Sequence, residues 1–445
     1  MKICRILLLA TVPAWLVACK KNSDTAPAPV ITGFSPAHGP SNTTLLINGS
    51  NFSTNEGENV VTMNGIDLPV IAASSTTITV KIPAKAGDGK ITVKRANQTA
   101  ESTAAFVYDY TVTVSTFAGS GNNAYAEGQG TAAKFSTPTG MVIDAQNNLY
   151  VADPGNSCIR KITPQGMVST FVGKPVTPGY TDGTGDAVRL GFPQDIAYDK
   201  SGNSFYIVDV YAYTNRIRKI TATGQVSTVA GGGSNTDETV SNPLDAKLNN
   251  GYAAYSVSYL AIDANKNIYV TDFDAHYIRK ISTTGISTLA GKKGTSGYLD
   301  GQGNSAMFST PNKIVTMDDG GLLVFDADNK RLRKIAPSGL VSTFAGNGNN
   351  VVLDATDPLH ASFTNLTGAL FQDRKGNVYL VDNGRLRLIT KAGRVVSLTT
   401  GGDGYADGNG SEAKFHYGGA MVMDSNDNLF VVDAGNNRIR KIVVE

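Results

Sequence analysis

Three of the four histidines, His276, His360 and His416, fall in connecting segments rather than in apolar runs. Three imidazoles around an open coordination position would suit a catalytic zinc ion. These three, however, lie in unlike local sequences, and no H-E-x-x-H, G-x-S-x-G or phosphate-binding glycine motif accompanies them. We therefore predict neither a metal site nor catalytic residues at these positions.

A short acidic motif also recurs in the connecting segments. It reads GYTDGTGDA at 179–187, GYLDGQGNSA at 297–306 and GYADGNGSEA at 404–413, with AYAEGQGTAA at 124–133. Asp-Gly-x-Gly bends the backbone, because glycine adopts positive φ and aspartate bonds amides ahead of it. Calcium is the alternative, with Asp182 and Asp186 as oxygen ligands, but the dense carboxylates and distal Glu of a strong calcium loop are missing. We favour a turn that folds the segment back.

Aromatic side chains gather in the same segments. Exposed rings can stack on sugars or peptides, with the tyrosine hydroxyl as a polar group. Our candidate ligand-binding residues are Tyr180, Tyr211, Tyr213, Phe273, His276, Tyr277, Tyr298 and Tyr405, and Tyr252, Tyr255 and Tyr417 belong to the same group of rings. We expect a saccharide or peptide to span Tyr211, Tyr213 and Phe273. The alternative is that most rings are packed between loops.

One Asp and one Arg recur together six times, Asp153 with Arg160 being the first pair. A catalytic group is rarely required six times in one chain, so we interpret these pairs as structural contacts. The others are Asp209 with Arg218, Asp272 with Arg279, Asp326 with Arg333, Asp382 with Arg387 and Asp433 with Arg440.

A repeat must position all these residues. VSTFAG at 114–119 has near copies beginning at Val168, Val226, Ile286, Val341 and Val396. Each interval holds four short runs rich in Val, Ile, Tyr, Phe and Thr, bounded by Gly, Asn and Asp, which is typical of a four-stranded antiparallel sheet. A sheet that is apolar on both faces must be covered by its neighbours, and radial stacking gives a β-propeller. An open solenoid is the alternative.

The two ends of the repeat array are complementary. The first VSTFAG has no complete unit before it, and the last unit stops after its third strand at IRKIVVE, 439–445. Pairing 113–118 with that unit would close a ring of six blades and cover both exposed edges. The long connections, for example 120–139, should share one face of the ring, and long loops on a rigid scaffold are a usual place for binding.

The copies YVADPGNSCIRKI (150–162), YVTDFDAHYIRKI (269–281) and FVVDAGNNRIRKI (430–442) resemble NHL repeats, over roughly 112–445. The fifth copy, YLVDNGRLRLI at 379–389, has a shortened loop and Leu388 for Lys, so this blade should differ locally. Residues 29–110, with SPAHGP, GSNF and FVY in order, resemble the IPT/TIG domain, an immunoglobulin-like β-sandwich. The resemblance implies a spacer or a glycan- or protein-binding module.

Residues 1–18 have the pattern of a signal peptide, with Lys2, Arg5 and a short apolar core. The ending LVAC resembles a bacterial lipobox, which would make Cys19 the lipidated first residue; an ordinary signal peptide is the alternative. Residues 19–28 read as a flexible tether, 29–110 as the sandwich and 111–445 as the propeller. The lipid would be the membrane attachment, since no later run of 18 apolar residues occurs.

Removal of Lys2 and Arg5 leaves as many basic as acidic residues, 37 of each, which argues against nucleic acid as a partner. We expect an all-β monomer anchored in the bacterial cell envelope, at the outer membrane or cell surface. Its function would be to bind an extracellular glycan, peptide or protein on the long-loop face. The alternative is a propeller hydrolase, lactonase or lyase with a metal in the central channel.

Overall fold

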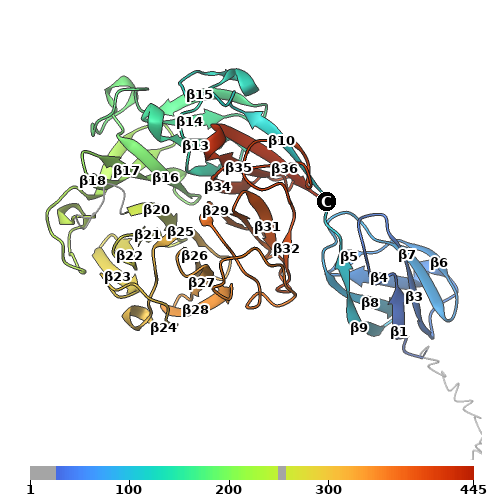
Figure 1. Cartoon of the computed structure of the whole chain (residues 1–445). Coiled ribbons are helices and arrows are strands. Elements are labelled where there is room, and N and C mark those ends of the chain that lie inside the picture. Colours follow the sequence, from blue (N-terminus) through green and yellow to red (C-terminus); the bar gives the residue numbers. More distant parts are fainter. Residues whose placement is uncertain (1–26, 249–256) are drawn as a thin grey trace, which may run out of the picture. The chain divides into compact units, whose positions relative to one another are not determined.

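The computed structural model describes residues 27–248 and 257–445 (Figure 1). Contacts divide them into two units, one built mainly from Asn42–Ile82 and Lys90–Phe106 and one that includes Val107–Glu445. The expected signal peptide, Cys19 and most of the tether lie outside the described residues. In the part that is described, no helix is both long and apolar enough to cross a membrane.

The N-terminal strands form a sandwich of two sheets, with the orders β1-β3-β7-β6 and β2-β9-β8-β4-β5. Their bounds are β1 Val30–Ser35, β2 His38–Gly39, β3 Thr44–Ser50, β4 Asn59–Met63, β5 Ile66–Asp67, β6 Val70–Ala73, β7 Thr77–Lys81, β8 Gly89–Arg95 and β9 Gln98–Tyr108. Every second residue faces the core, as Leu45 and Ile47 of β3 and Ile91 and Val93 of β8 show by their full burial. The expected β-sandwich is confirmed.

Within the described residues, the second unit contains six antiparallel sheets of four principal strands each, the blades of a propeller. Blade one has β12 Met141–Ile143, β13 Leu149–Asp153, β14 Cys158–Ile162 and β15 Met167–Val172. Blade two has β16 Phe192–Asp199, β17 Ser204–Tyr211, β18 Thr214–Thr221 and β19 Val226–Gly231. Blade three has β20 Val257–Ile262, β21 Ile268–Asp272, β22 Tyr277–Ser282 and β23 Gly285–Ala290.

Blade four has β25 Pro311–Thr316, β26 Leu322–Asp326, β27 Arg331–Ile335 and β28 Leu340–Ala345. Blade five has β29 Leu366–Gln372, β30 Val378–Asp382, β31 Arg385–Ile389 and β32 Val395–Ser397. Blade six has β34 Gly418–Met423, β35 Leu429–Asp433, β36 Arg438–Val444 and β10 Val112–Ala118. The first strand of each blade contacts the first strand of the next, so these strands form the inner wall of the ring.

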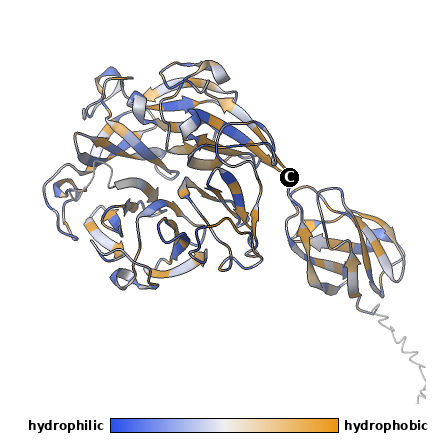
Figure 2. Cartoon of the chain, viewed as in Figure 1, coloured by the Kyte–Doolittle hydropathy of each residue, from blue (hydrophilic) through white to orange (hydrophobic). Residues whose placement is uncertain are grey.

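The core consists of apolar layers between neighbouring blades. Tyr150 and Ala152 of blade one pack with Ile196 and Ile207 of blade two, for example. The second strand β13 is buried at all five positions, because a blade covers each of its faces. Figure 2 shows how hydrophobic and hydrophilic residues mix along the strands of both units. The core is thus divided among the contacts between blades, as the apolar composition of both faces predicts.

Blade six closes the ring with strands from opposite ends of the repeat array. β10 pairs antiparallel with β36, from Val112 opposite Val444 to Ala118 opposite Ile439. The Thr111 N–H donates to the Glu445 carbonyl oxygen over 2.7 Å, and the Glu445 N–H returns a bond of 2.9 Å. The predicted closure is confirmed, and the open solenoid is excluded.

The long connections form straps that cross one face of the ring. Each begins at the outer strand of one blade and folds back along the outer strand of the next. Two-residue strands mark this contact: β11 Gly128–Gln129 pairs with β15, β24 Gly301–Gln302 with β28, and β33 Gly408–Asn409 with β10. These pairs contain residues of the acidic motif, so its predicted role in folding the segment back is confirmed.

Candidate functional site

The aspartate of the repeated motif is an internal ion-pair partner. Asp182 Oδ1 accepts hydrogen bonds from Nε and Nη2 of Arg218, over 3.0 and 2.6 Å. Its other oxygen accepts from the Thr228 N–H over 2.9 Å, at the edge strand β19. Asp300, Asp354 and Asp407 pair in the same way with Arg333, Arg387 and Arg440. These aspartates therefore fix the straps of blades two, four, five and six to their own blades.

The recurring pairs of Asp and Arg lie beneath the straps. Arg160 Nη1 lies 3.0 Å from Asp153 Oδ2, with both side chains fully buried. Blades two, four, five and six repeat the contact at 2.6 to 3.0 Å. Burial raises the pKa of Asp209 to about 7, against the opposing charge of Arg218. A raised carboxyl pKa can mark a catalytic acid, but the burial and repetition of these pairs confirm the structural interpretation in the five blades.

The motif tyrosines lie flat beneath guanidinium groups. The Arg216, Arg331 and Arg438 guanidinium carbons are 3.6, 4.0 and 3.9 Å from the ring centroids of Tyr180, Tyr298 and Tyr405. The hydroxyls are bonded as well: that of Tyr298 lies 2.8 Å from Thr343 Oγ1, that of Tyr405 lies 3.0 Å from Thr116 Oγ1, and that of Tyr180 donates to the Tyr211 carbonyl over 3.1 Å. These three predicted ligand-binding residues hold the straps.

The predicted aromatic site over blades two and three is only partly exposed. Tyr213 lies at the tip of the β17–β18 hairpin with 78% of its surface exposed, and Phe273 has 37% exposed. The Tyr211 ring packs edge-on against Tyr180 at 5.5 Å between centroids. Tyr277 is fully buried, so the expectation of an exposed ring is wrong for this residue, because its position in β22 faces the core. Tyr252 and Tyr255 lie outside the described residues.

The three histidines have separate partners. His276 Nδ1 accepts from the Thr310 N–H over 3.1 Å, and His360 Nδ1 lies 3.2 Å from Asp357. His416 Nδ1 lies 2.6 Å from Asp403 Oδ1. Nowhere in 27–248 and 257–445 do three or more His, Cys, Asp or Glu side chains gather in a group that could hold a metal ion.

Two charged side chains meet on the innermost strands. Lys313 Nζ of β25 lies 2.8 Å from both carboxylate oxygens of Asp195 in β16, and both side chains are buried. Asp195 also accepts from the Leu260 N–H over 3.2 Å. A Cβ on Gly419 of β34 would lie 2.4 Å from the Thr139 carbonyl, so backbones approach closely on this inner wall. We assign this ion pair, which sequence reasoning missed, to the framework.

Blade five departs from its neighbours in the turn after the second strand. In blades one and six the turn forms a short 3-10 helix, and its asparagine donates to a strap carbonyl: Asn156 to Ala124 over 3.1 Å and Asn436 to Gly404 over 2.9 Å. Blade five has only Asn383–Gly384 here, with its paired Asp and Arg five residues apart instead of seven. The local difference expected from the fifth copy is confirmed.

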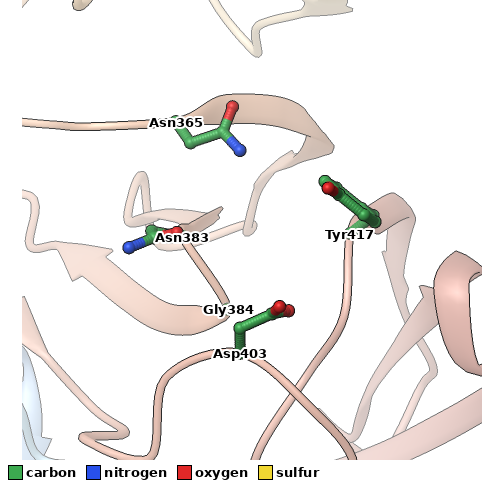
Figure 3. Close-up of a pocket in the computed structure, with 5 residues that line it drawn as sticks. All are labelled: Asn365, Asn383, Gly384, Asp403 and Tyr417. Carbon is green, nitrogen blue, oxygen red and sulfur yellow. The ribbon is translucent and has the colours of Figure 1, made fainter.

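The shortened turn leaves a small polar pocket on the strap face. A cavity of about 70 Å³ is lined by Asn365, Asn383, Gly384, Asp403 and Tyr417, which surround a common space in Figure 3. Gly384 has φ +72°, and a Cβ there would lie 2.7 Å from the carbonyl oxygens of Gly402 and Phe415. Only glycine therefore lets this turn approach the strap of blade six so closely.

The polar groups of this pocket are largely free to bind a ligand. Among the described residues, the Asn365 and Asn383 carboxamides have no hydrogen-bond partner, and only Oδ1 of Asp403 is engaged, by His416. The Tyr417 ring lies 4.3 Å from the His416 ring between centroids and is 57% exposed. The pocket thus offers two amides, one carboxylate oxygen and a partly exposed phenol.

Sequence reasoning missed Asn365, Asn383 and Asp403 as site residues and named Tyr417 only among the aromatic residues. The signal that could have found them is the shortened fifth copy, since a turn that loses two residues must uncover what the longer turns cover.

Comparisons with known proteins agree with this architecture. A model of the teneurin NHL domain matches residues 119–336, and a model of the IPT/TIG domain matches 29–110. Teneurin-3 of Danio rerio is 29% identical over 235 residues, which cover 47% of this chain and 8% of teneurin-3. Human NHL repeat-containing protein 2 is 29% identical over 204 residues, which cover 42% of this chain and 26% of that protein.

Solved structures share the fold over nearly the whole chain. A protein of unknown function from Bacteroides thetaiotaomicron has a TM-score of 0.60 at 20% identity, covering 95% of this chain and 99% of its own. An auxiliary nutrient binding protein from the same species has a TM-score of 0.55 at 21% identity, covering 94% and 98%. The family models thus find an IPT/TIG domain followed by an NHL domain, and in the structure the second unit is a β-propeller.

Proposed function

We propose that this protein is an extracytoplasmic binding protein that holds a saccharide on the strap face of its propeller, in the pocket between blades five and six. The observation that carries the proposal is the convergence of the free Asn365 and Asn383 carboxamides with Asp403 and Tyr417. The other asparagines at this turn, such as Asn156 and Asn436, are engaged in holding straps. Unengaged amides are what a hydroxylated ligand requires.

The same fold in auxiliary nutrient binding proteins of Bacteroides thetaiotaomicron and Bacteroides ovatus supports a binding role. Without residues 1–18 the chain would carry 37 basic and 37 acidic residues, and this balance supports a neutral ligand. The protein would act as a monomer, with the sandwich as a spacer or as a second binding module for glycan or protein. A peptide is the second candidate ligand, because carboxamides and an aromatic ring can also bind peptide groups.

Binding is tested by screening the purified chain on glycan and peptide arrays. The double variant Asn365→Ala/Asn383→Ala should weaken binding of the array ligand at least about fivefold, since it removes two or more hydrogen bonds of about 0.5–1.5 kcal/mol each. The triple variant Tyr211→Ala/Tyr213→Ala/Phe273→Ala tests the placement over blades two and three. Loss of binding in the triple variant alone would move the site to those blades.

We also propose that Cys19 carries a lipid that anchors the protein in the bacterial cell envelope, at the outer membrane or cell surface. The LVAC ending of residues 16–19 supports this placement. Cys19→Ser should release the protein from the membrane fraction, because the acyl chains are its proposed attachment. Immunoblotting of separated fractions measures the effect, and full membrane retention of the variant would contradict the assignment.

A further inference from the structure

We infer that the pocket between blades five and six recognises two neighbouring hydroxyls on the edge of one neutral sugar ring, and that His416 is a positioning residue for this recognition. The inference rests on the proposed binding function and specifies its ligand. The hydroxyls donate to Asp403 and accept from the carboxamides of Asn365 and Asn383, while the Tyr417 ring lies beside the sugar ring.

The charge of the lining determines which ligands are excluded. Asp403 is the one charged residue among the five that line the cavity, and one oxygen of its carboxylate is free of His416. A carboxylate, sulfate or phosphate on the ligand would be repelled by this charge at close range. Acidic sugars are therefore excluded from the pocket.

The mixture of donors and acceptors argues against an amine. A carboxylate only accepts hydrogen bonds, whereas each carboxamide of Asn365 and Asn383 offers two donors and one acceptor. An ammonium group would donate to Asp403 and to the amide oxygens but, having no acceptor, would offer nothing to the amide donors. A hydroxyl both donates and accepts, so two adjacent hydroxyls match the whole lining.

The size of the cavity limits how much of the ligand enters. A volume of about 70 Å³ holds on the order of a few water-sized groups. It therefore accepts one edge of a ring and excludes a chain of sugars, which points to a terminal residue of a glycan. The exposed Tyr417 ring at the rim provides an apolar face for the part of the sugar that stays outside.

His416 is held on several sides and in turn holds two pocket residues. Its backbone N–H donates to the Asp433 carboxylate over 2.8 Å, and its ring packs on Gly435, where a Cβ would lie 1.8 Å from the ring. Because a carboxylate oxygen only accepts, Nδ1 must carry the proton in its 2.6 Å bond to Asp403. The ring also packs against Tyr417. His416 thus fixes the direction of the free Asp403 oxygen without lining the cavity.

The test titrates the full chain by calorimetry with methyl glycosides of mannose, glucose and galactose, then with the monodeoxy analogues of any glycoside that binds. We expect one neutral glycoside to bind and at least a tenfold loss when either of two adjacent hydroxyls is removed. Methyl glucuronide should not bind. Preferential binding of methyl glucosaminide, which carries an ammonium group, would overturn the diol inference.

Variants locate the contact. Asp403→Asn should reduce affinity for the bound glycoside at least tenfold. The matched control Asp357→Asn removes the carboxylate of another exposed pair of Asp and His on the propeller, which lies outside the pocket, and should leave affinity unchanged. Full binding by Asp403→Asn would overturn the placement of the diol.

Two His416 variants separate positioning from packing. His416→Phe retains a ring beside Tyr417 but loses the bond to Asp403, so the ratio of affinities for the glycoside and its deoxy analogue should fall toward one. His416→Asn restores a donor near the Nδ1 position and should recover the ratio. An unchanged ratio in His416→Phe, with an unchanged melting temperature, would refute the positioning role.

The inference can fail while the proposed function stands. Suppose that no monosaccharide binds at concentrations up to about 10 mM, which sets the weakest affinity that the titration needs to detect. If an array ligand nevertheless binds, and its binding is lost in Asn365→Ala/Asn383→Ala, the diol inference is wrong and the site is right. If no array ligand depends on the pocket, both are wrong.

Discussion

Blades five and six carry the same framework and differ in one turn. Each has an Arg that bonds a buried Asp and an Asp of its strap: Arg387 in blade five and Arg440 in blade six. In blade six, Asn436 fills the turn and ties down the strap, whereas in blade five the turn is Asn383–Gly384 and a cavity is left. A repeat scaffold can thus gain a cavity by losing two residues at a position that the framework does not need.

The largest contrast between the two blades concerns the source of their outer strands. Blade five is continuous in sequence, whereas blade six takes β10 from the other end of the repeat array. Deleting Thr111–Gly119 removes the buried Val112, Val114 and Ala118 from blade six. A loss of about 1.5–3 kcal/mol for each valine, together with two exposed edges, should lower the melting temperature and cause aggregation.

Calorimetry and light scattering measure this effect. The control is a chain that begins at Thr111, which lacks the sandwich but keeps β10. An unchanged melting temperature and a monomeric state after the deletion would count against the ring.

The shared framework predicts equal effects in the two blades. Arg387→Met and Arg440→Met should each cost about 3–5 kcal/mol in the free energy of unfolding, because each leaves buried Asp382 or Asp433 without its charge partner. Urea denaturation measures the loss, and Arg374→Met, at an exposed position, is the control. A much smaller loss in blade five would show that the shortened turn has already loosened its framework.

Grafting the turn of blade six onto blade five should remove the cavity and with it the binding of the ligand. Replacing Asn383–Gly384 by Ala-Gly-Asn-Asn, the sequence at 434–437 in blade six, should fill the cavity and reduce ligand affinity at least about tenfold, which corresponds to 1.4 kcal/mol. The melting temperature should be kept, since blade six tolerates this turn. A grafted chain that binds as tightly as the parent would exclude the pocket.

The smallest expected effect separates two tyrosines. Tyr417→Ala removes a rim ring and should weaken binding by about 0.5–1.5 kcal/mol, with little change in stability. Tyr405→Ala removes a ring that is covered by Arg438 and bonded to Thr116. It should lower stability and leave binding nearly unchanged. If both variants weaken the titrated affinity equally, Tyr417 does not differ from Tyr405 in its contribution to binding.

Periodic features of this chain were predictable, and irregular ones were not. The strands, the closure of the ring and the pairs such as Asp153 with Arg160 follow from a repeated pattern, because the same residue types recur at the same positions in successive repeats. The burial of Tyr277 depends on its register in β22, and the contact of Asp195 with Lys313 joins residues 118 positions apart. Both depend on side-chain geometry that is not repeated from blade to blade, which composition and spacing do not determine.

The pocket could be predicted from the sequence only in part. The shortened fifth copy was visible in the sequence, so a local difference in blade five could be expected. That Asn365 and Asp403 meet there depends on how the strap of blade six crosses the turn of blade five, and Asp403 stands just outside the motif that drew attention to Asp407.

The bonds between Thr111 and Glu445 also bear on the order of the blades along the chain. Since these residues touch, a short linker joining Glu445 to Thr111 would make the backbone of the ring continuous, and a new opening within a strap would give a circular permutant with the same contacts. Blade six would then form from contiguous sequence, and another blade would have to be assembled from the two ends. The position of the opening would decide which blade is assembled from the two ends. Comparing the refolding rates of such permutants would measure how much of the folding time is spent bringing the two ends together.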